Sequence, residues 1–182
     1  RKFGANGFYA SPSAVDQYEE TQGSLVSLSQ RHQLGNWVFK PKLYWRRGQD
    51  MYEYIRNKPE IYRNLHITHK VGGALDVSVP SQLGRTGVGV DISKVSIRSN
   101  NLGNHKRTMM NLFLEHRFYF FNNTLDITPG IAVNYFSDFG THSFPGVDLG
   151  WQLNPNLRVY ANTGATFHLP SGAVSLWCKG FR

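Results

Sequence analysis

The stretch LDITPGIAVNY, residues 125–135, alternates apolar and polar side chains with a period of two residues. The same alternation returns at residues 146–153 and again at residues 157–168. Successive side chains of a β-strand point to opposite faces, so each segment is predicted to be a strand with one apolar and one polar face. The joins are a tight Asn154-Pro155-Asn156 turn and a longer segment from Ser137 to Ser143.

The rest of the chain follows the same rule. Five more strands are predicted, at residues 24–30, 37–46, 65–79, 88–97 and 110–120. Short turns at 33–35, 80–85 and 122–123 alternate with longer loops at 1–22, 48–64 and 99–106. Alternating short and long joins are typical of outer-membrane barrels, whose short turns are periplasmic and whose longer loops are external. We therefore expect an all-β fold: an antiparallel transmembrane β-barrel fragment of about eight strands.

The strand around residue 40 gives this prediction a length scale. Trp37 and Trp45 share its apolar face, while Lys40 and Lys42 lie on the other face, which fits a wet lumen better than a dry core. Eight residues span roughly 26 Å along a strand. At a tilt of about 40°, that is roughly 20 Å along the membrane normal, near the spacing of the aromatic girdles that flank an apolar band. A soluble sandwich with two core tryptophans is the competing interpretation.

Four residues fit the pattern less well. Pro41 and Pro129 fall inside predicted strands, where proline cannot donate to the ladder. His116 falls on the predicted lipid face. The alternation also changes parity near Ser93, which predicts either a bulge or the end of the membrane band there.

Composition narrows the function classes. The 182 residues hold 20 Lys and Arg against 12 Asp and Glu, a formal net charge of +8, but the basic residues are dispersed. No helical basic stripe or nucleic-acid-binding motif accompanies them, so we expect no nucleic-acid partner. The single cysteine, Cys178, excludes an intramolecular disulfide. No apolar run is long enough for a membrane-spanning helix. Targeting cannot be read from a chain that begins at Arg1.

The polar residues do not suggest an enzyme, a metal site or a bound cofactor. His142 and Ser143 are adjacent, so on a strand they would point to opposite faces, and we expect both in a solvated loop. His66 and His69 likewise fall on opposite faces and make a poor metal pair. We expect a lumen charge network in which acidic residues of the strands pair with Arg117 and Arg158. Those acidic residues are Asp76, Asp91, Asp126 and Asp148.

Several segments also resemble a known family. The run from Phe3 to Tyr9, followed by Gln17 to Thr21, resembles an external loop of TonB-dependent outer-membrane receptors, particularly vitamin B12 (cobalamin) receptors of the Bacteroidetes type. Tyr44 to Asp50 resembles a strand-to-loop segment of that group. Later strands are also similar, at residues 113–116, 144–148 and 160–171. The resemblance covers about residues 2–171 and implies a location in the bacterial outer membrane.

Two departures from the family matter for domain organisation. Nothing resembles the N-terminal plug domain or its TonB box. After Ser171 the sequence GAVSLWCKGFR leaves the family pattern and lacks a terminal barrel-assembly signal. We therefore expect a partial receptor barrel over residues 1–171 and an atypical tail over 172–182, as truncation or a reading-frame change near Ser171 would produce. Such a fragment is not expected to transport by itself.

The resemblance implies capture of a scarce nutrient by external loops and passage through the lumen, powered by the TonB complex through a plug domain absent from this chain. Cobalamin is the first expectation, and an iron siderophore or haem is the alternative. Aromatic and arginine side chains would hold such a ligand by stacking and hydrogen bonds. The candidate ligand contacts are Phe8, Tyr9, Arg46, Arg47, Asp50, Tyr52, Tyr62 and Arg63.

A second class of function stays open, a self-sufficient eight-stranded barrel with a structural or adhesive role. It predicts that Ser24–Gln30 pairs with Leu157–Leu169 to close the sheet. A fragment of a larger barrel would leave both strands as open edges.

Overall fold

The computed structural model describes residues 2–4 and 16–166, which form one antiparallel sheet of ten strands. The strands are β1 (Lys2–Gly4), β2 (Tyr18–Ser29), β3 (His32–Leu34), β4 (Trp37–Glu53), β5 (Arg63–Ser81), β6 (Gly84–Ser99), β7 (Gly103–Phe120), β8 (Leu125–Phe136), β9 (Gly140–Asn154) and β10 (Leu157–Gly164). Their order is β1-β2-β4-β5-β6-β7-β8-β9-β10, with β3 also paired to β4. The described residues contain no helix long and apolar enough to cross a membrane.

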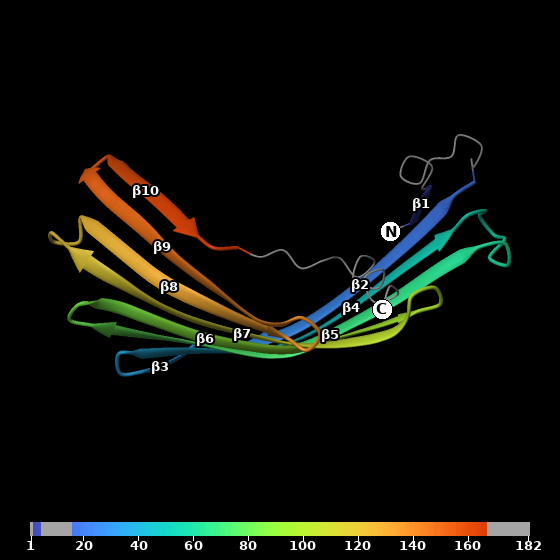
Figure 1. Cartoon of the computed structure of the whole chain (residues 1–182), viewed down its shortest axis with the longest axis horizontal. Helices are drawn as coiled ribbons and strands as arrows, with labels where there is room; N and C mark the ends of the chain where they lie inside the picture. Colours follow the sequence, from blue (N-terminus) through green and yellow to red (C-terminus); the bar gives the residue numbers. More distant parts are fainter. Residues whose placement is uncertain (1, 5–15, 167–182) are drawn as a thin grey trace.

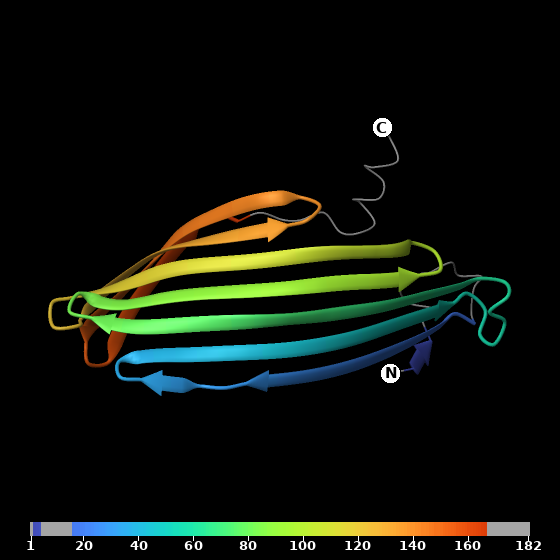
Figure 2. The same cartoon turned by 90° about the horizontal axis from the view of Figure 1, so that it is seen from below.

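The sheet is a single curved layer that is open along one side. Figure 1 shows a trough with β1 and β2 at one rim and β10 at the other, and Figure 2 shows the long strands running side by side along it. In the described residues β10 pairs with β9 alone and does not meet β2. The closed eight-stranded barrel is therefore wrong for this structure. The soluble sandwich is wrong as well, because all the strands of residues 2–4 and 16–166 belong to one sheet, and a sandwich needs two.

The predicted loops are shorter than expected because the strands extend into them. β4 continues to Glu53, where it pairs with β2 on one side and β5 on the other. Paired backbone groups on both sides need no apolar alternation to stay in the ladder. Between β4 and β9, the joins at this end of the sheet, the loop-side end, cover residues 54–62, 100–102 and 137–139. The predicted loops at 1–22, 48–64, 99–106 and 137–143 thus include strand residues, among them His142 and Ser143 of β9.

The opposite, turn-side end carries tight turns where the sequence predicted them. They lie at residues 35–36, 82–83, 121–124 and 155–156. Asn122 and Asn123 have φ angles of 54° and 68°, a left-handed conformation that asparagine tolerates better than most residues.

Both strand prolines occupy positions where the ladder does not need their missing donor. The Pro41 carbonyl accepts a hydrogen bond from the Gln30 amide, so its ring nitrogen faces the gap between β2 and β3. Pro129 lies at the interruption in the β7–β8 pairing, between the Glu115–Gly130 and Phe118–Ile127 pairs. Both prolines therefore fit into the sheet without shifting the register of the strands.

The register confirms the two predicted faces along the long strands. One face, which we call the outer face, carries exposed apolar side chains such as Leu43, Val71 and Ile92, with exposed fractions of 62%, 54% and 52%. Aromatic residues border this apolar band, with Trp37, Phe118, Phe120 and Trp151 near the turn-side end and Trp45 and Tyr135 near the loop-side end. The other face, the inner face, is mainly polar. Among the described residues Phe136 is the one buried hydrophobic side chain, so the sheet has no conventional core.

The parity change near Ser93 marks the end of the apolar band and is not a bulge. β6 keeps an unbroken register with β5 and β7 through this residue. Ile92 is the last apolar outer-face residue of β6, and Lys94 follows it on the same face. Ser93 itself lies on the inner face and is only 2% exposed.

Candidate functional site on the inner face

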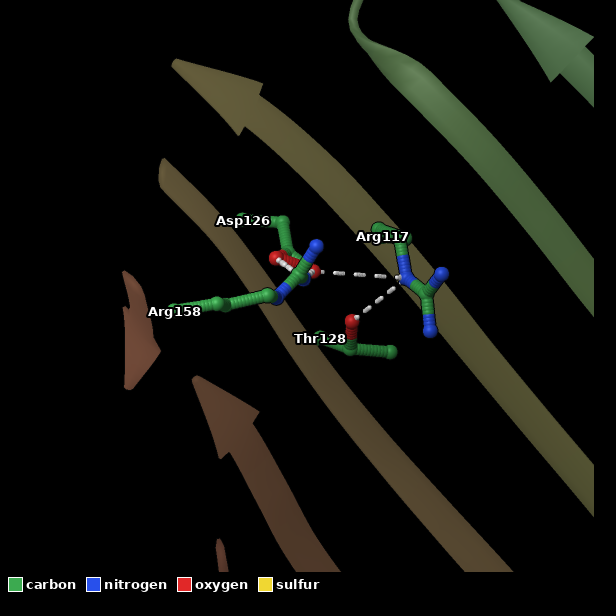
Figure 3. Close-up of polar contacts among 4 residues, drawn as sticks. All are labelled: Arg117, Asp126, Thr128 and Arg158. Carbon is green, nitrogen blue, oxygen red and sulfur yellow. Dashed lines mark hydrogen bonds and ion pairs between the residues drawn. The ribbon is translucent and has the colours of Figure 1, made fainter. Parts of the chain in front are cut away.

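An ion-pair network joins β7, β8 and β10 on the inner face, reaching across the intervening strand β9. The Asp126 carboxylate of β8 accepts from the Arg158 guanidinium of β10 at 2.6 and 2.9 Å. Arg117 of β7 lies 3.9 Å from the same carboxylate and donates to the Thr128 hydroxyl at 3.2 Å. Figure 3 shows the two arginines approaching from either side. Gly150 of β9 leaves the necessary space, because a Cβ there would collide with Asp126 and Arg158.

This network confirms part of the predicted lumen charge network. Asp126 does pair with both arginines that the sequence proposed. Asp91 instead accepts a hydrogen bond from Tyr44, and Asp148 forms no ion pair with Arg117 or Arg158 among the described contacts. Asp148 is too far along the sheet to reach Arg158, because in the strand register it lies opposite Asn162 of β10, four residues beyond Arg158.

A tyrosine forms the second polar cluster, nearer the loop-side end. The Tyr44 hydroxyl donates to the Asp91 carboxylate, with its oxygen 3.0 and 3.1 Å from the two carboxylate oxygens. Lys42 and Lys70 place their ammonium groups 5.6 and 5.4 Å from the tyrosine ring centroid. The ring lies across Gly72, where an added Cβ would be 2.6 Å from ring atoms. The sequence prediction missed this cluster because alternation shows faces and not which residues meet across strands.

A hollow with charges of both signs lies at the turn-side part of the inner face. It has a volume of about 280 Å³. Its charged lining residues are Lys40, Asp76, Arg85, Glu115 and Arg117. Arg85 and Arg117 are direct cross-strand neighbours. A wall of this kind can hydrogen-bond to water, a polar solute or a polar protein surface.

Polar and aromatic residues also gather where the inner face reaches the loop-side end. Asp50 and Tyr52 of β4 share this face with Glu19 of β2, and the Tyr52 and Tyr62 rings meet edge to face at 6.4 Å between centroids. Burial, and secondarily repulsion by Asp50, raises the pKa of the Glu19 carboxyl. The Asp50 Oδ1 atom is buried and accepts no hydrogen bond from the described residues. Asp50, Tyr52 and Tyr62 are the predicted ligand contacts that the structure brings to one place, and Glu19 adds a group that the sequence analysis did not predict.

The other predicted contacts are dispersed. Arg46 lies on the inner face opposite Lys70, whereas Arg47 lies on the outer face and donates to Gln49 at 2.7 Å. Adjacent strand residues cannot point into one ligand pocket, so Arg46 and Arg47 do not form a clamp. Arg63 is the first residue of β5 and lies on the outer face, directly across from Glu53 in the strand register. The predicted contacts Phe8 and Tyr9 lie outside the described residues.

The histidines within residues 2–4 and 16–166 make separate contacts on the two faces of the sheet. His66 is on the inner face beside Ser99 at 2.8 Å, and His69 is on the outer face against Trp45. His116 is on the outer face as predicted, where its Nδ1 lies 2.8 Å from the Thr86 hydroxyl and its ring contacts Phe118. Across residues 2–4 and 16–166 no group of three His, Cys, Asp or Glu side chains could hold a metal ion.

Known proteins place this two-faced sheet in a family. Residues 2–177 match the family model for the TonB dependent receptor-like β-barrel. A siderophore receptor PirA from Pseudomonas aeruginosa superposes with a TM-score of 0.73 at 12% identity, covering 86% of this chain and 28% of that one. PirA from Acinetobacter baumannii gives 0.53 at 11% identity, covering 76% and 24%. No curated protein sequence matches. The chain thus spans about a quarter of the length of these receptors, and it belongs to the TonB-dependent receptor family as part of its β-barrel.

Proposed function

We propose that this chain forms part of the wall of a transporter that imports a scarce nutrient across the outer membrane. TonB-dependent receptors are transporters of the Gram-negative outer membrane. The observation that supports the proposal most strongly is the two-faced sheet, with an apolar band bordered by aromatic residues on one face and paired charges on the other. An apolar band of this kind suits lipid, and a polar wall suits a hydrated lumen.

The residues that would meet the nutrient first lie at the loop-side end of the inner face. Arg46, Asp50, Tyr52 and Tyr62 offer a guanidinium, an unpaired acceptor and two aromatic rings. Such groups can hold a large polar solute by stacking and by charge-assisted hydrogen bonds. Arg47 and Arg63 would face away from the lumen and are left out of this site.

Two nutrient classes are compatible with these groups. Cobalamin follows from the sequence resemblance, with its amides and phosphate as hydrogen-bonding partners. An iron chelate is the second candidate, and the fold likeness to siderophore receptors is the observation that favours it. Passage would require a plug domain and the TonB complex, which are proposed partners of the complete receptor.

Direct binding measurements on the complete receptor would test the proposal. Titration with cyanocobalamin and, separately, with ferric siderophores should show saturable binding of one class. Losing a charge-assisted contact costs about 1.5–3 kcal/mol, so Arg46→Gln should weaken that binding roughly tenfold or more. Arg47→Gln removes the same charge from the other face and is the matched control, expected to leave the affinity unchanged. Equal loss in both variants, or no binding of either nutrient class, would contradict the proposal.

A further inference from the structure

The outer face changes from apolar to basic near the same level in four strands. Arg47, His69 and Lys106 are level with Ser96 of β6, and Lys94 lies one step nearer the apolar band. Moving toward the loop-side end, the outer face passes from Trp45 to Arg47 in β4 and from Val71 to His69 in β5. It passes from Ile92 to Lys94 in β6 and, beyond Met110 and Thr108, to Lys106 in β7. The apolar band therefore ends in a row of cationic or protonatable side chains.

These residues form a compact patch around Ser96. Ser96 is paired directly with His69 on one side and Lys106 on the other, and Lys94 and Arg98 precede and follow it on the same face of β6. Neighbouring strands lie about 4.8 Å apart, and alternate residues of a strand about 6.7 Å. We call Arg47, His69, Lys94, Arg98 and Lys106 the basic patch.

Within the described part of the chain, the basic patch has no acidic ion-pair partner. The ion pairs of the described residues involve none of its members. The outward acids of these strands, Glu20 and Glu53, lie farther toward the loop-side end, level with Met51 and Arg63. Glu20 contacts Lys2 and Gln22, and the Glu53 carboxylate accepts from the Asn57 amide. Lys94, Arg98 and Lys106 are exposed, so their charges are open to an external anion.

We propose that the basic patch binds the phosphate group of a membrane lipid headgroup. This inference rests on the proposed membrane location, because only then does the edge of the apolar band coincide with the layer of lipid headgroups. A lipid bound there would contact the apolar side chains of the band with its acyl chains and the basic patch with its phosphate. Lys and Arg supply the donors that phosphate oxygens accept, and the Ser96 hydroxyl at the centre adds one more.

The alternatives account for the position less well. A soluble anion would gain nothing from the neighbouring apolar side chains Ile92 and Val71, which are about half exposed on the apolar band. An acidic protein partner would have to approach through the lipid that covers the adjoining surface. A phosphorylated lipid satisfies both halves of the surface at once.

Trp45 provides a natural reporter, because its ring lies 6.0 Å from the His69 ring at the margin of the basic patch. The full chain, with Trp37, Trp151 and Trp177 replaced by Phe, would be reconstituted in phosphatidylcholine vesicles. Quenching of Trp45 would be titrated with phosphatidic acid carrying a spin label on its acyl chain, and with phosphatidylcholine carrying the same label. Excess inorganic phosphate in a parallel titration separates a lipid headgroup from a free anion as the preferred ligand.

We expect spin-labelled phosphatidic acid to quench Trp45 at a lower mole fraction than spin-labelled phosphatidylcholine does. Excess inorganic phosphate should leave this preference nearly unchanged. A cation near a membrane surface attracts an anionic lipid by about 1 kcal/mol, roughly fivefold, so K94Q/R98Q/K106Q should reduce the preference on the order of a hundredfold. K42Q/R46Q/K70Q removes three charges from the inner face and should leave it intact. The charge-conserving K94R/R98K/K106R should retain it, and K94Q alone should lower it about fivefold.

The outcomes separate this inference from the proposed function. Equal quenching by both labelled lipids, or an equal loss in the inner-face variant, would overturn the lipid-phosphate assignment while leaving the chain in the membrane. Competition by free phosphate would replace the headgroup by a soluble anion and would also overturn it. Absence of quenching by either labelled lipid would instead contradict the membrane location on which both proposals rest.

Discussion

Replacing Gly72 with alanine should disrupt the tyrosine cluster of the inner face. An added Cβ would lie 2.6 Å from the Tyr44 Cζ and Oη atoms and 2.8 Å from the Ser93 Cβ. The tyrosine ring can move, but the Ser93 Cβ is fixed to the backbone of the neighbouring strand. Shifting the ring also lengthens its hydrogen bonds of 3.0 and 3.1 Å to Asp91.

The expected cost follows from these contacts. Overpacking costs about 1–3 kcal/mol, and a hydrogen bond to a charged group contributes about 1.5–3 kcal/mol, of which a displaced ring loses only part. Alanine in place of glycine in a strand offsets about 0.5–1 kcal/mol. Gly72→Ala should therefore lower the free energy of unfolding by about 2 kcal/mol.

Urea unfolding of the full chain in lipid vesicles, followed by tryptophan fluorescence, would measure this loss. Gly48→Ala is the matched control. Gly48 of β4 lies on the inner face, as Gly72 of β5 does, and an added Cβ there would have no atom within 4 Å. It should change stability by no more than about 0.5 kcal/mol. In a Tyr44→Ala background the Gly72→Ala cost should shrink. Equal effects of the two glycine substitutions would refute the reasoning.

Two other predictions concern charged groups of the inner face. Asp126→Asn and Arg158→Gln should each lower the free energy of unfolding by about 1–2 kcal/mol, a value reduced because the arginine is half exposed. The double variant should lose less than the sum of the two single losses, because both remove the same ion pair. Additive losses in urea unfolding would argue against the ion pair. Because the folded structure raises the pKa of Glu19, the protonated carboxyl contributes to stability. This contribution is fully present below the ordinary pKa of 4.5 and is lost as the pH rises through the raised pKa. Glu19→Gln should remove that dependence, and Asp50→Asn should lower the Glu19 pKa only in part, as carboxyl NMR titration would show, because burial is the larger cause.

The sequence predicted the faces of the sheet better than the ends of its strands. In the proposed membrane setting, the outer face of the apolar band meets lipid. A change of register by one residue would expose polar groups to that lipid, which explains why the alternation is strict there. Beyond Trp45 both faces are polar, and nothing in the pattern distinguishes the paired residues 48–53 from a loop. The register decided this, because β2 and β5 remain beside β4 there.

The candidate site was predictable to the same extent. The Asp126 network could be expected, because charges on one face of neighbouring strands can meet only each other or water. The Tyr44 cluster could not, since it depends on Gly72 lying directly opposite on β5 and Asp91 lying one strand further. Arg46 and Arg47 were both predicted as ligand contacts, but the alternation that predicted the strands also places these neighbouring residues on opposite faces.

The central claim, that the apolar face meets lipid and the polar face meets water, can be tested on four consecutive residues of β5. Single cysteines at Ala74, Leu75, Asp76 and Val77, with Cys178 replaced by Ser, would be introduced into the full chain in lipid vesicles. A membrane-impermeant thiol reagent should label positions 74 and 76 and spare 75 and 77, and a spin label at each position should report lipid only at 75 and 77. Uniform labelling of all four positions would contradict the account.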